Sequence, residues 1–233
     1  MSFSPSHTLS GAELAQITEH QATEQRQWQS AGPEGYLVEC FDREFLVLPG
    51  VFPPREDSRL LAESLEIKPG EEVLDVGTGS GVLAVHAALV GAGKVVAVDW
   101  NEDAVETAKQ NVEKHDVSAL VEARVSNVFS TLGEAELFDV IVANLPDRNI
   151  PALDLDAAAQ WDTGFQAHKM FFGGVRKHLQ SGGRIYMVMA NYPELTDMVK
   201  LAEEAGFEVA VVGEKAMSDG DPRTFYAFLL TDK

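Results

Sequence analysis

Ten consecutive residues constrain the fold of this chain more than any other part of it. Residues 72–81 read Glu-Val-Leu-Asp-Val-Gly-Thr-Gly-Ser-Gly, an apolar run that stops at three glycines spaced by one residue. The run predicts a buried strand, and the glycines predict a tight turn that a ligand can approach closely, because no Cβ intervenes. The apolar residues after Gly81 predict a helix whose free N–H groups face whatever lies over the turn.

Two carboxylates at predicted strand ends indicate which ligand this turn favours. A dinucleotide-binding turn has the spacing Gly-x-Gly-x-x-Gly, whereas here the third glycine comes one residue early and Asp75 precedes the first. Asp75 would repel a pyrophosphate but can face an ammonium group. Asp99 ends a second apolar strand, residues 94–100, where a carboxylate can accept hydrogen bonds from both hydroxyls of a ribose. These features argue against a nicotinamide dehydrogenase and against a glycine-rich turn without a ligand.

Together the glycine turn, Asp75 and Asp99 resemble the S-adenosylmethionine (SAM) site of class I methyltransferases. The resemblance implies a Rossmann-like α/β fold with a seven-stranded, mostly parallel sheet, an antiparallel last strand and helices on both faces. The carboxyl-terminal part of the sequence agrees with an antiparallel last strand. Only a short polar segment separates the last two strand patterns, residues 207–212 and 224–230, so no crossover helix fits between them and the last strand is expected to run antiparallel.

A proline-rich segment before the glycine turn carries a closer resemblance. Residues 49–58 read Pro-Gly-Val-Phe-Pro-Pro-Arg-Glu-Asp-Ser and lead into a predicted helix, residues 59–65, that Asp57 or Ser58 can cap. This order resembles the glutamine methyltransferases that act on peptide-chain release factors, over residues 46–183. In that family the equivalent segment helps enclose the methionine end of SAM, which implies Arg55, Asp57 and Ser58 as candidates.

A second motif of that family is altered in this chain. The family pattern is Asn-Pro-Pro-Tyr, whereas residues 144–147 read Asn-Leu-Pro-Asp after the fourth predicted strand. The resemblance implies that Asn144 orients the acceptor, while Asp147 replaces the aromatic ring that would stack on a planar amide. We expect Asp147 to accept a proton or to pair with a cation. Tyr192, at the end of the fifth predicted strand, is expected to position the acceptor or to stabilise a cation.

The resemblance also implies a set of residues that hold SAM, among which Asn127 and Val128 would contact the adenine. The set is Asp57, Ser58, Asp75, Gly77, Thr78, Gly79, Gly81, Asp99, Trp100, Asn127, Val128, Asn144, Leu145 and Pro146. Trp161 and Phe165, in a loop that starts at Leu153, are expected either to wall the pocket or to belong to the core. Because no cluster of His, Asp and Glu has metal-ligand spacing, no metal is predicted.

Charge and composition restrict the partners of the chain. Its 37 acidic and 18 basic residues give a net charge of -19, and no basic run is present that could neutralise a phosphate backbone. The expected acceptor is therefore a small molecule or a protein, and a nucleic acid is disfavoured. No apolar run has the length of a membrane span, and no secretory signal is visible. We expect a cytoplasmic protein, without an internal disulfide since Cys40 is the single cysteine.

The predicted organisation has two parts. Residues 1–50 are expected to form a helix and a hairpin that cover the pocket as a lid or contribute to a homodimer, and residues 51–233 to form the SAM-binding domain. The predicted function is methyl transfer from SAM. The alternatives are a SAM-consuming enzyme that cyclises the aminobutyrate arm to azetidine-2-carboxylate and releases methylthioadenosine, and a non-catalytic SAM-binding domain.

Overall fold

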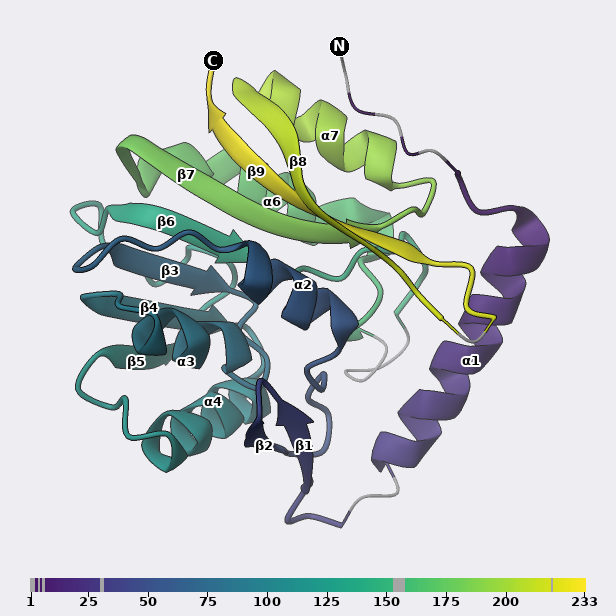
Figure 1. Ribbon diagram of the computed structural model, residues 1–233, viewed down its shortest axis with the longest axis horizontal. Helices are drawn as coiled ribbons and strands as arrows, with labels where there is room; N and C mark the ends of the chain where they lie inside the picture. The colour runs from purple at the N-terminus through teal and green to yellow at the C-terminus, as the bar shows by residue number, and fades with distance from the viewer. Residues whose placement is uncertain (1–2, 4, 6, 30–31, 153–157, 219) are drawn as a thin grey trace.

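The computed structural model describes residues 3, 5, 7–29, 32–152, 158–218 and 220–233. A central sheet of seven strands has the order β5-β4-β3-β6-β7-β9-β8 (Figure 1). The strands are β3 (Glu72–Val76), β4 (Lys94–Asp99), β5 (Val121–Val125), β6 (Phe138–Ala143), β7 (Leu179–Ala190), β8 (Phe207–Ala216) and β9 (Thr224–Asp232). β9 pairs antiparallel with both β7 and β8, while the other pairs are parallel, as predicted.

Two layers of helices bury the two faces of the sheet. One layer consists of α2 (Glu56–Ser64), α3 (Val82–Leu89) and α4 (Glu102–Lys114), and the other of α6 (Gln166–Gly174) and α7 (Leu195–Glu204). Successive residues of a strand face opposite helix layers. Val73 belongs to the core cluster with α2 and α3, and Leu74 belongs to the cluster with α6 and α7. This period of two explains why the strands are continuous apolar runs, because parallel strands covered on both faces have no polar side.

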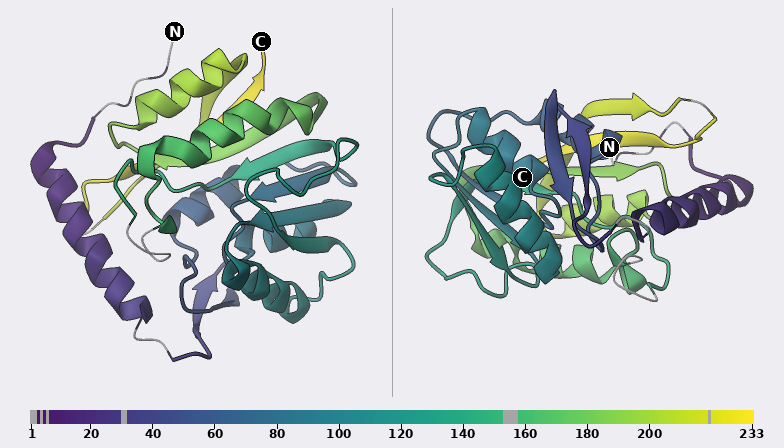
Figure 2. Two further views of the ribbon diagram at one scale, coloured as in Figure 1. Left: turned by 180° about the vertical axis from the view of Figure 1, so that it is seen from behind. Right: turned by 90° about the horizontal axis from the view of Figure 1, so that it is seen from below.

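The first fifty residues form a helix and a separate two-stranded hairpin. α1 (Gly11–Gln29) begins with a capping box, in which Ser10 N–H donates to Glu13 Oε2 at 2.8 Å. β1 (Tyr36–Cys40) and β2 (Arg43–Val47) pair antiparallel. Figure 2 shows α1 along one side of the molecule, at the end of the sheet where the carboxyl termini of the parallel strands lie.

Several predicted boundaries move by a few residues. α2 begins at Glu56, so Asp57 and Ser58 lie in its first turn, and the prediction that either of them caps the helix is wrong. Arg55 occupies the N-cap position without a side-chain cap. β6 ends at Ala143, before Asn144, because Pro146 cannot donate a ladder hydrogen bond and the chain turns away from the sheet there.

Candidate functional site

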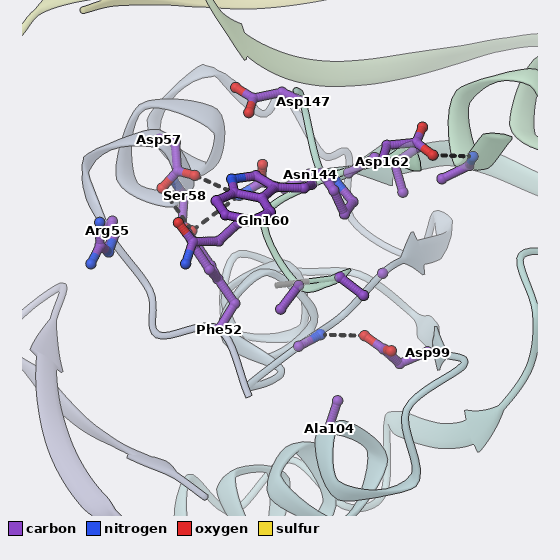
Figure 3. Close-up of a pocket in the computed structure, with 18 of the residues that line it drawn as sticks. Phe52, Arg55, Asp57, Ser58, Asp99, Ala104, Asn144, Asp147, Gln160 and Asp162 are labelled. Carbon is purple, nitrogen blue, oxygen red and sulfur yellow. Dashed lines mark hydrogen bonds between the residues drawn. The ribbon is translucent and has the colours of Figure 1, made fainter. Parts of the chain in front are cut away.

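A cavity of about 1020 Å³ opens at the carboxyl edge of β3, β4, β5 and β6 (Figure 3). Ligands collect at this edge in open parallel sheets, because the connecting loops there diverge around a crevice. One end of the cavity, which we call the glycine-loop end, is lined by Gly77, Thr78, Gly79 and Asp99. The other, which we call the Tyr192 end, is lined by Asp147, Tyr192, Asp221 and Arg223.

The structure brings most of the predicted site residues to this cavity. Those that line it are Arg55, Asp57, Ser58, Gly77, Thr78, Gly79, Asp99, Trp100, Asn127, Val128, Asn144, Leu145, Pro146, Asp147, Trp161 and Tyr192. Asp75 and Gly81 lie behind the glycine loop and do not line the cavity. Phe165 belongs to the core, where it stacks on His168 at 4.0 Å, while Leu153 lies outside the described residues.

The three glycines of the loop have left-handed backbones and separate roles. Gly77, Gly79 and Gly81 have φ values of 75°, 53° and 80°, a region that side chains with a Cβ rarely adopt. A Cβ on Gly81 would lie 3.0 Å from the Cα and Cβ of Ala108, so this glycine lets the loop pack against α4. Gly77 and Gly79 instead present backbone to the cavity.

Asp99 closes the loop from the neighbouring strand. Its Oδ2 accepts from Gly79 N–H and its Oδ1 from Asn101 N–H, both at 3.0 Å. Burial raises the pKa of this carboxyl, although these backbone donors act in the opposite direction. Each carboxylate oxygen has further acceptor capacity, so the group can still receive hydrogen bonds from a ligand in the cavity.

Asp75 supports the loop from below. It is 1% exposed, and its Oδ2 accepts from the Thr78 hydroxyl at 2.6 Å, while no partner for Oδ1 is found in the described part of the chain. Burial raises the pKa of Asp75 to about 7, and the negative charge of Asp99 adds to the increase. The placement gives Asp75 a role in the shape of the loop rather than a direct contact with the cavity.

The segment after β5 forms the wall of the cavity beyond Asp99. Asn127 and Val128 follow β5, and Val128 has a positive φ of 53° that turns the chain. The hydroxyl of Ser126, a buried residue that the sequence did not single out, donates to Val128 O at 3.0 Å and holds this turn. Trp100 stands at the rim, 49% exposed.

Asn144, which follows β6, links that strand by hydrogen bonds to the proline-rich segment in the middle of the cavity. Its Nδ2 donates to Asp57 Oδ2 at 3.2 Å and to Ser58 Oγ at 3.3 Å, and these bonds are drawn in Figure 3. Both partners are buried in the first turn of α2. The two motifs that the sequence singled out separately therefore form one polar cluster.

Asp147 faces the cavity at the Tyr192 end. Its Oδ2 accepts a hydrogen bond from Ala190 N–H at 3.4 Å, the one bond found for it among the described residues. Burial raises the pKa of Asp147 to about 7, and the negative charge of Asp57 contributes, while Arg223 and Arg148 act in the opposite direction. A carboxyl with this pKa is poised to exchange a proton near neutral pH.

Sequence reasoning missed Gln160 and Arg223. Gln160 is 4% exposed and lines the cavity, and neither the nitrogen nor the oxygen of its amide has a hydrogen-bond partner among the residues that the structure describes. Arg223 is 8% exposed and pairs with Asp221. Both come from loops without a recognisable pattern, and the one available signal was an isolated arginine in the polar segment before the last strand.

Among the described residues, no group of three His, Cys, Asp or Glu side chains is arranged to hold a metal ion. None of the helices in the described part of the chain is both long and apolar enough to cross a membrane.

Comparison with known proteins identifies relatives of the chain. A family model described as ribosomal protein L11 methyltransferase (PrmA) matches residues 59–164. The release factor glutamine methyltransferase of Koribacter versatilis is 36% identical over 176 residues, which are 66% of this chain and 61% of that protein. The ribosomal protein L11 methyltransferase of Dictyoglomus thermophilum is 33% identical over 150 residues, 64% of this chain and 42% of that protein.

A solved structure gives the same assignment of the fold. The 16S rRNA N2 G1207 methyltransferase RsmC of T. thermophilus, in complex with AdoMet and guanosine, superposes with a TM-score of 0.64 at 25% identity. The match covers 85% of this chain and 50% of that one. The chain therefore spans between about two fifths and three fifths of the length of these relatives.

Proposed function

Because the chain belongs to the class I SAM-dependent methyltransferases, we propose that it transfers a methyl group from SAM to an amine nitrogen of a protein acceptor. The observation that carries this proposal is the position of Asp147. Its carboxyl faces the cavity in the altered motif that begins at Asn144, and its pKa lies near neutral pH.

The glycine-loop end fits SAM. Gly77 and Gly79 have no Cβ and therefore leave space for a ligand at this end. A Cβ on Gly77 would also lie 3.3 Å from Leu145 Cδ2. Asp99 offers two carboxylate oxygens to a pair of ribose hydroxyls, as acidic residues at this position do in nucleotide sites. Arg55, Asp57 and Ser58 would enclose the amino-acid end. The cavity of about 1020 Å³ exceeds the usual size of a single small-ligand pocket, which leaves space for an acceptor group.

The residues of the chain then prepare the acceptor. When bound, SAM supplies a methyl group on a positively charged sulfur, and the carbon–sulfur bond breaks as the bond from the acceptor nitrogen forms. Asn144, fixed by Asp57 and Ser58, would orient the nitrogen toward that methyl group. Asp147 would take the proton that the nitrogen loses. The walls around Trp161 and Tyr192 would exclude water.

An amine suits this site better than the amide of glutamine. A planar amide would lose the aromatic partner that stacks on it in the related motif, and it is uncharged, so it gains no ionic attraction from a carboxylate. Asp147 stands where the aromatic ring of the related motif would be, and Asp57 adds a second carboxylate nearby. Two carboxylates favour a cationic group before reaction and provide a base for it.

A protein acceptor is favoured over the other classes. The two relatives described above by sequence identity are named for a release factor and for ribosomal protein L11, and both are proteins. RsmC is named for rRNA, but the net charge of -19 opposes binding to a phosphate backbone. The comparisons give no support to the expected homodimer.

The test uses calorimetry and product analysis. We expect the purified chain to bind SAM and S-adenosylhomocysteine, and to methylate L11 or a release factor on an amine that tandem mass spectrometry identifies. Methylation of a glutamine would contradict the amine assignment. Methylthioadenosine formed without any acceptor would instead establish the SAM-cyclising alternative, and the absence of SAM binding would end the proposal.

We also propose that residues 1–50 cover the acceptor part of the cavity as a lid. His20 and Gln21 of α1 line the cavity. Arg148, immediately after Asp147, donates to Thr18 Oγ1 at 2.7 Å and so ties α1 to the altered motif. The helix would thereby respond to the occupancy of the site.

A further inference from the structure

The Tyr192 end contains hydrogen-bond donors that the proposed methyl transfer does not use. The Tyr192 side chain is 1% exposed and lines the cavity, and its hydroxyl, beside the Arg223 guanidinium, accepts or donates no hydrogen bond of normal geometry within the described residues. Leaving a buried polar group unpaired destabilises the protein. The cost is recovered when a ligand supplies the missing acceptor, so the hydroxyl marks a place where an oxygen of the ligand would lie.

Arg223 adds a cation at the same place. Its guanidinium is 8% exposed, and Asp221 accepts from Nε at 3.0 Å and from Nη2 at 2.6 Å. Nη1 lies outside this ion pair. Arg223 also lines the cavity, and its charge acts on both Tyr192 and Asp147. The fork geometry of arginine suits an oxygen anion at the free edge.

A second buried arginine strengthens the positive character of this end. Arg148 is 6% exposed and lies over the Tyr192 ring, 5.1 Å from its centroid. Arg148 and Arg223 are the two Lys or Arg side chains that are less than 9% exposed in the described part of the chain, and the charges of both act on Tyr192. In a chain of net charge -19, this concentration of buried cations calls for a negative partner.

The local charges leave room for one anion. Arg148 and Arg223 contribute two positive charges and Asp221 contributes one negative charge, so this end carries one net positive charge when Asp147, whose pKa is about 7, is protonated. A carboxylate placed between Tyr192 and Arg223 would accept from the hydroxyl and from Nη1, and would complete the pairing of this end.

We infer that the acceptor carries a carboxylate, which binds to the Tyr192 hydroxyl and Arg223 Nη1 while its amine faces Asn144 and Asp147. The amine half of this inference rests on the proposed function; the carboxylate half does not. Two sources share this chemistry: a free amino acid, or an acidic side chain or terminus beside the methylated amine of a protein.

The experiment measures ligand binding without turnover. The chain saturated with S-adenosylhomocysteine is titrated by calorimetry with ω-amino acids from 3-aminopropanoate to 6-aminohexanoate, and with the primary amides of the same lengths. Butanoate and butanamide, which carry no amine, test the contribution of the carboxylate alone. Lysine peptides with a neighbouring Glu or Gln form the protein arm. We expect the acid to bind about tenfold more tightly than the amide in at least one arm, the size of a charge-assisted hydrogen bond.

Two substitutions test whether Tyr192 and Arg223 cause that preference for the acid. Tyr192→Phe removes an oxygen that has no hydrogen-bond partner among the described residues, so the fold is retained, and we expect the tenfold preference to fall to about threefold without loss of thermal stability. Arg223→Gln should abolish it. Tyr226→Phe, in the core, and Arg176→Gln, paired with exposed Asp232, are matched controls that should keep it.

The outcomes separate the two proposals. Equal binding of acids and amides in every arm, with S-adenosylhomocysteine bound, overturns the carboxylate site alone. A preference that survives in both Tyr192→Phe and Arg223→Gln also overturns it. Failure to bind S-adenosylhomocysteine overturns the proposed function. A preference in the butanoate arm without methylation of any amine supports the carboxylate site and rejects the amine acceptor.

Discussion

The two ends of the cavity differ in how their polar groups are satisfied before any ligand binds. At the glycine-loop end, both oxygens of Asp99 accept backbone N–H groups, and Gly77 and Thr78 donate to Val98 O at 2.8 and 3.0 Å. At the Tyr192 end, counting the described residues alone, the Tyr192 hydroxyl has no hydrogen-bond partner and Asp147 has one long hydrogen bond. Hydrogen bonds fix the first end in shape, whereas the second is completed by its ligand.

The difference follows from how each end is built. The glycine-loop end consists of consecutive backbone at the tips of adjacent strands, so the ladder that forms the sheet also forms the site. The Tyr192 end assembles side chains from the loop after β6, the end of β7 and the hairpin before β9. Preorganised backbone suits a cofactor that every reaction uses, and convergent side chains suit the recognition of one acceptor.

The largest effect is expected from Asp147→Asn. Loss of a positioned base lowers turnover by about 10²–10⁴-fold, while the Kd for SAM should change by less than about twofold, because Asp147 does not reach the glycine-loop end. In the wild-type protein the rate should rise with pH through about 7, where Asp147 loses its proton, and then level off. The variant should lack this rise. A pH–rate profile with calorimetry of SAM binding checks both, and an unchanged profile would reject Asp147 as the base.

A substitution at the other end should show the reverse pattern. Asp99→Asn replaces one of the two carboxylate oxygens by a donor, so it loses hydrogen bonds to a charged group that are worth about 1.5–3 kcal/mol each. We expect the Kd for SAM to rise about 100-fold, with the acceptor KM at saturating SAM nearly unchanged. An equal rise in the Kd for SAM and in the acceptor KM would show that the two ends are coupled.

The sequence predicted these two ends unequally, for a physical reason. Strand periodicity, glycine spacing and the carboxylates at strand ends are local signals, and they predicted the seven-stranded, mostly parallel sheet, the glycine loop and the position of Asp99 at a strand end. Asn144 and Asp147 were found because they follow a strand directly. Arg223 and Gln160 come from loops, and only the packing of distant segments brings them to the cavity. The same limit applies to Asp75, whose side chain points under the loop rather than into the ligand space.

Asp75 allows a test of stability rather than binding. Its folded pKa of about 7 lies above the ordinary value near 4, so the folded state holds a proton that the unfolded chain has lost between these values. Stability therefore falls as pH rises from about 4 to 7, and the full penalty persists above 7. Asp75→Asn removes that penalty. We expect the variant to exceed the wild-type protein by about 2 kcal/mol at pH 8, with a smaller difference at pH 5, in urea unfolding followed at both values. A difference that does not change with pH would show that Asp75 is ionised in the folded protein.

The smallest effect should come from the tie between α1 and the Tyr192 end. Thr18→Val keeps the shape of the side chain but removes the oxygen that accepts from Arg148 Nη1. One such bond is worth about 1 kcal/mol, which corresponds to about a fivefold change in an opening equilibrium. Hydrogen exchange of the α1 amides should accelerate by about that factor, and the acceptor KM should rise by less. Thr23→Val is a matched control, since both hydroxyls donate to the carbonyl four residues earlier in α1. Equal acceleration in both variants would mean that the lost helix-internal bond, rather than the tie to Arg148, controls the opening of the lid.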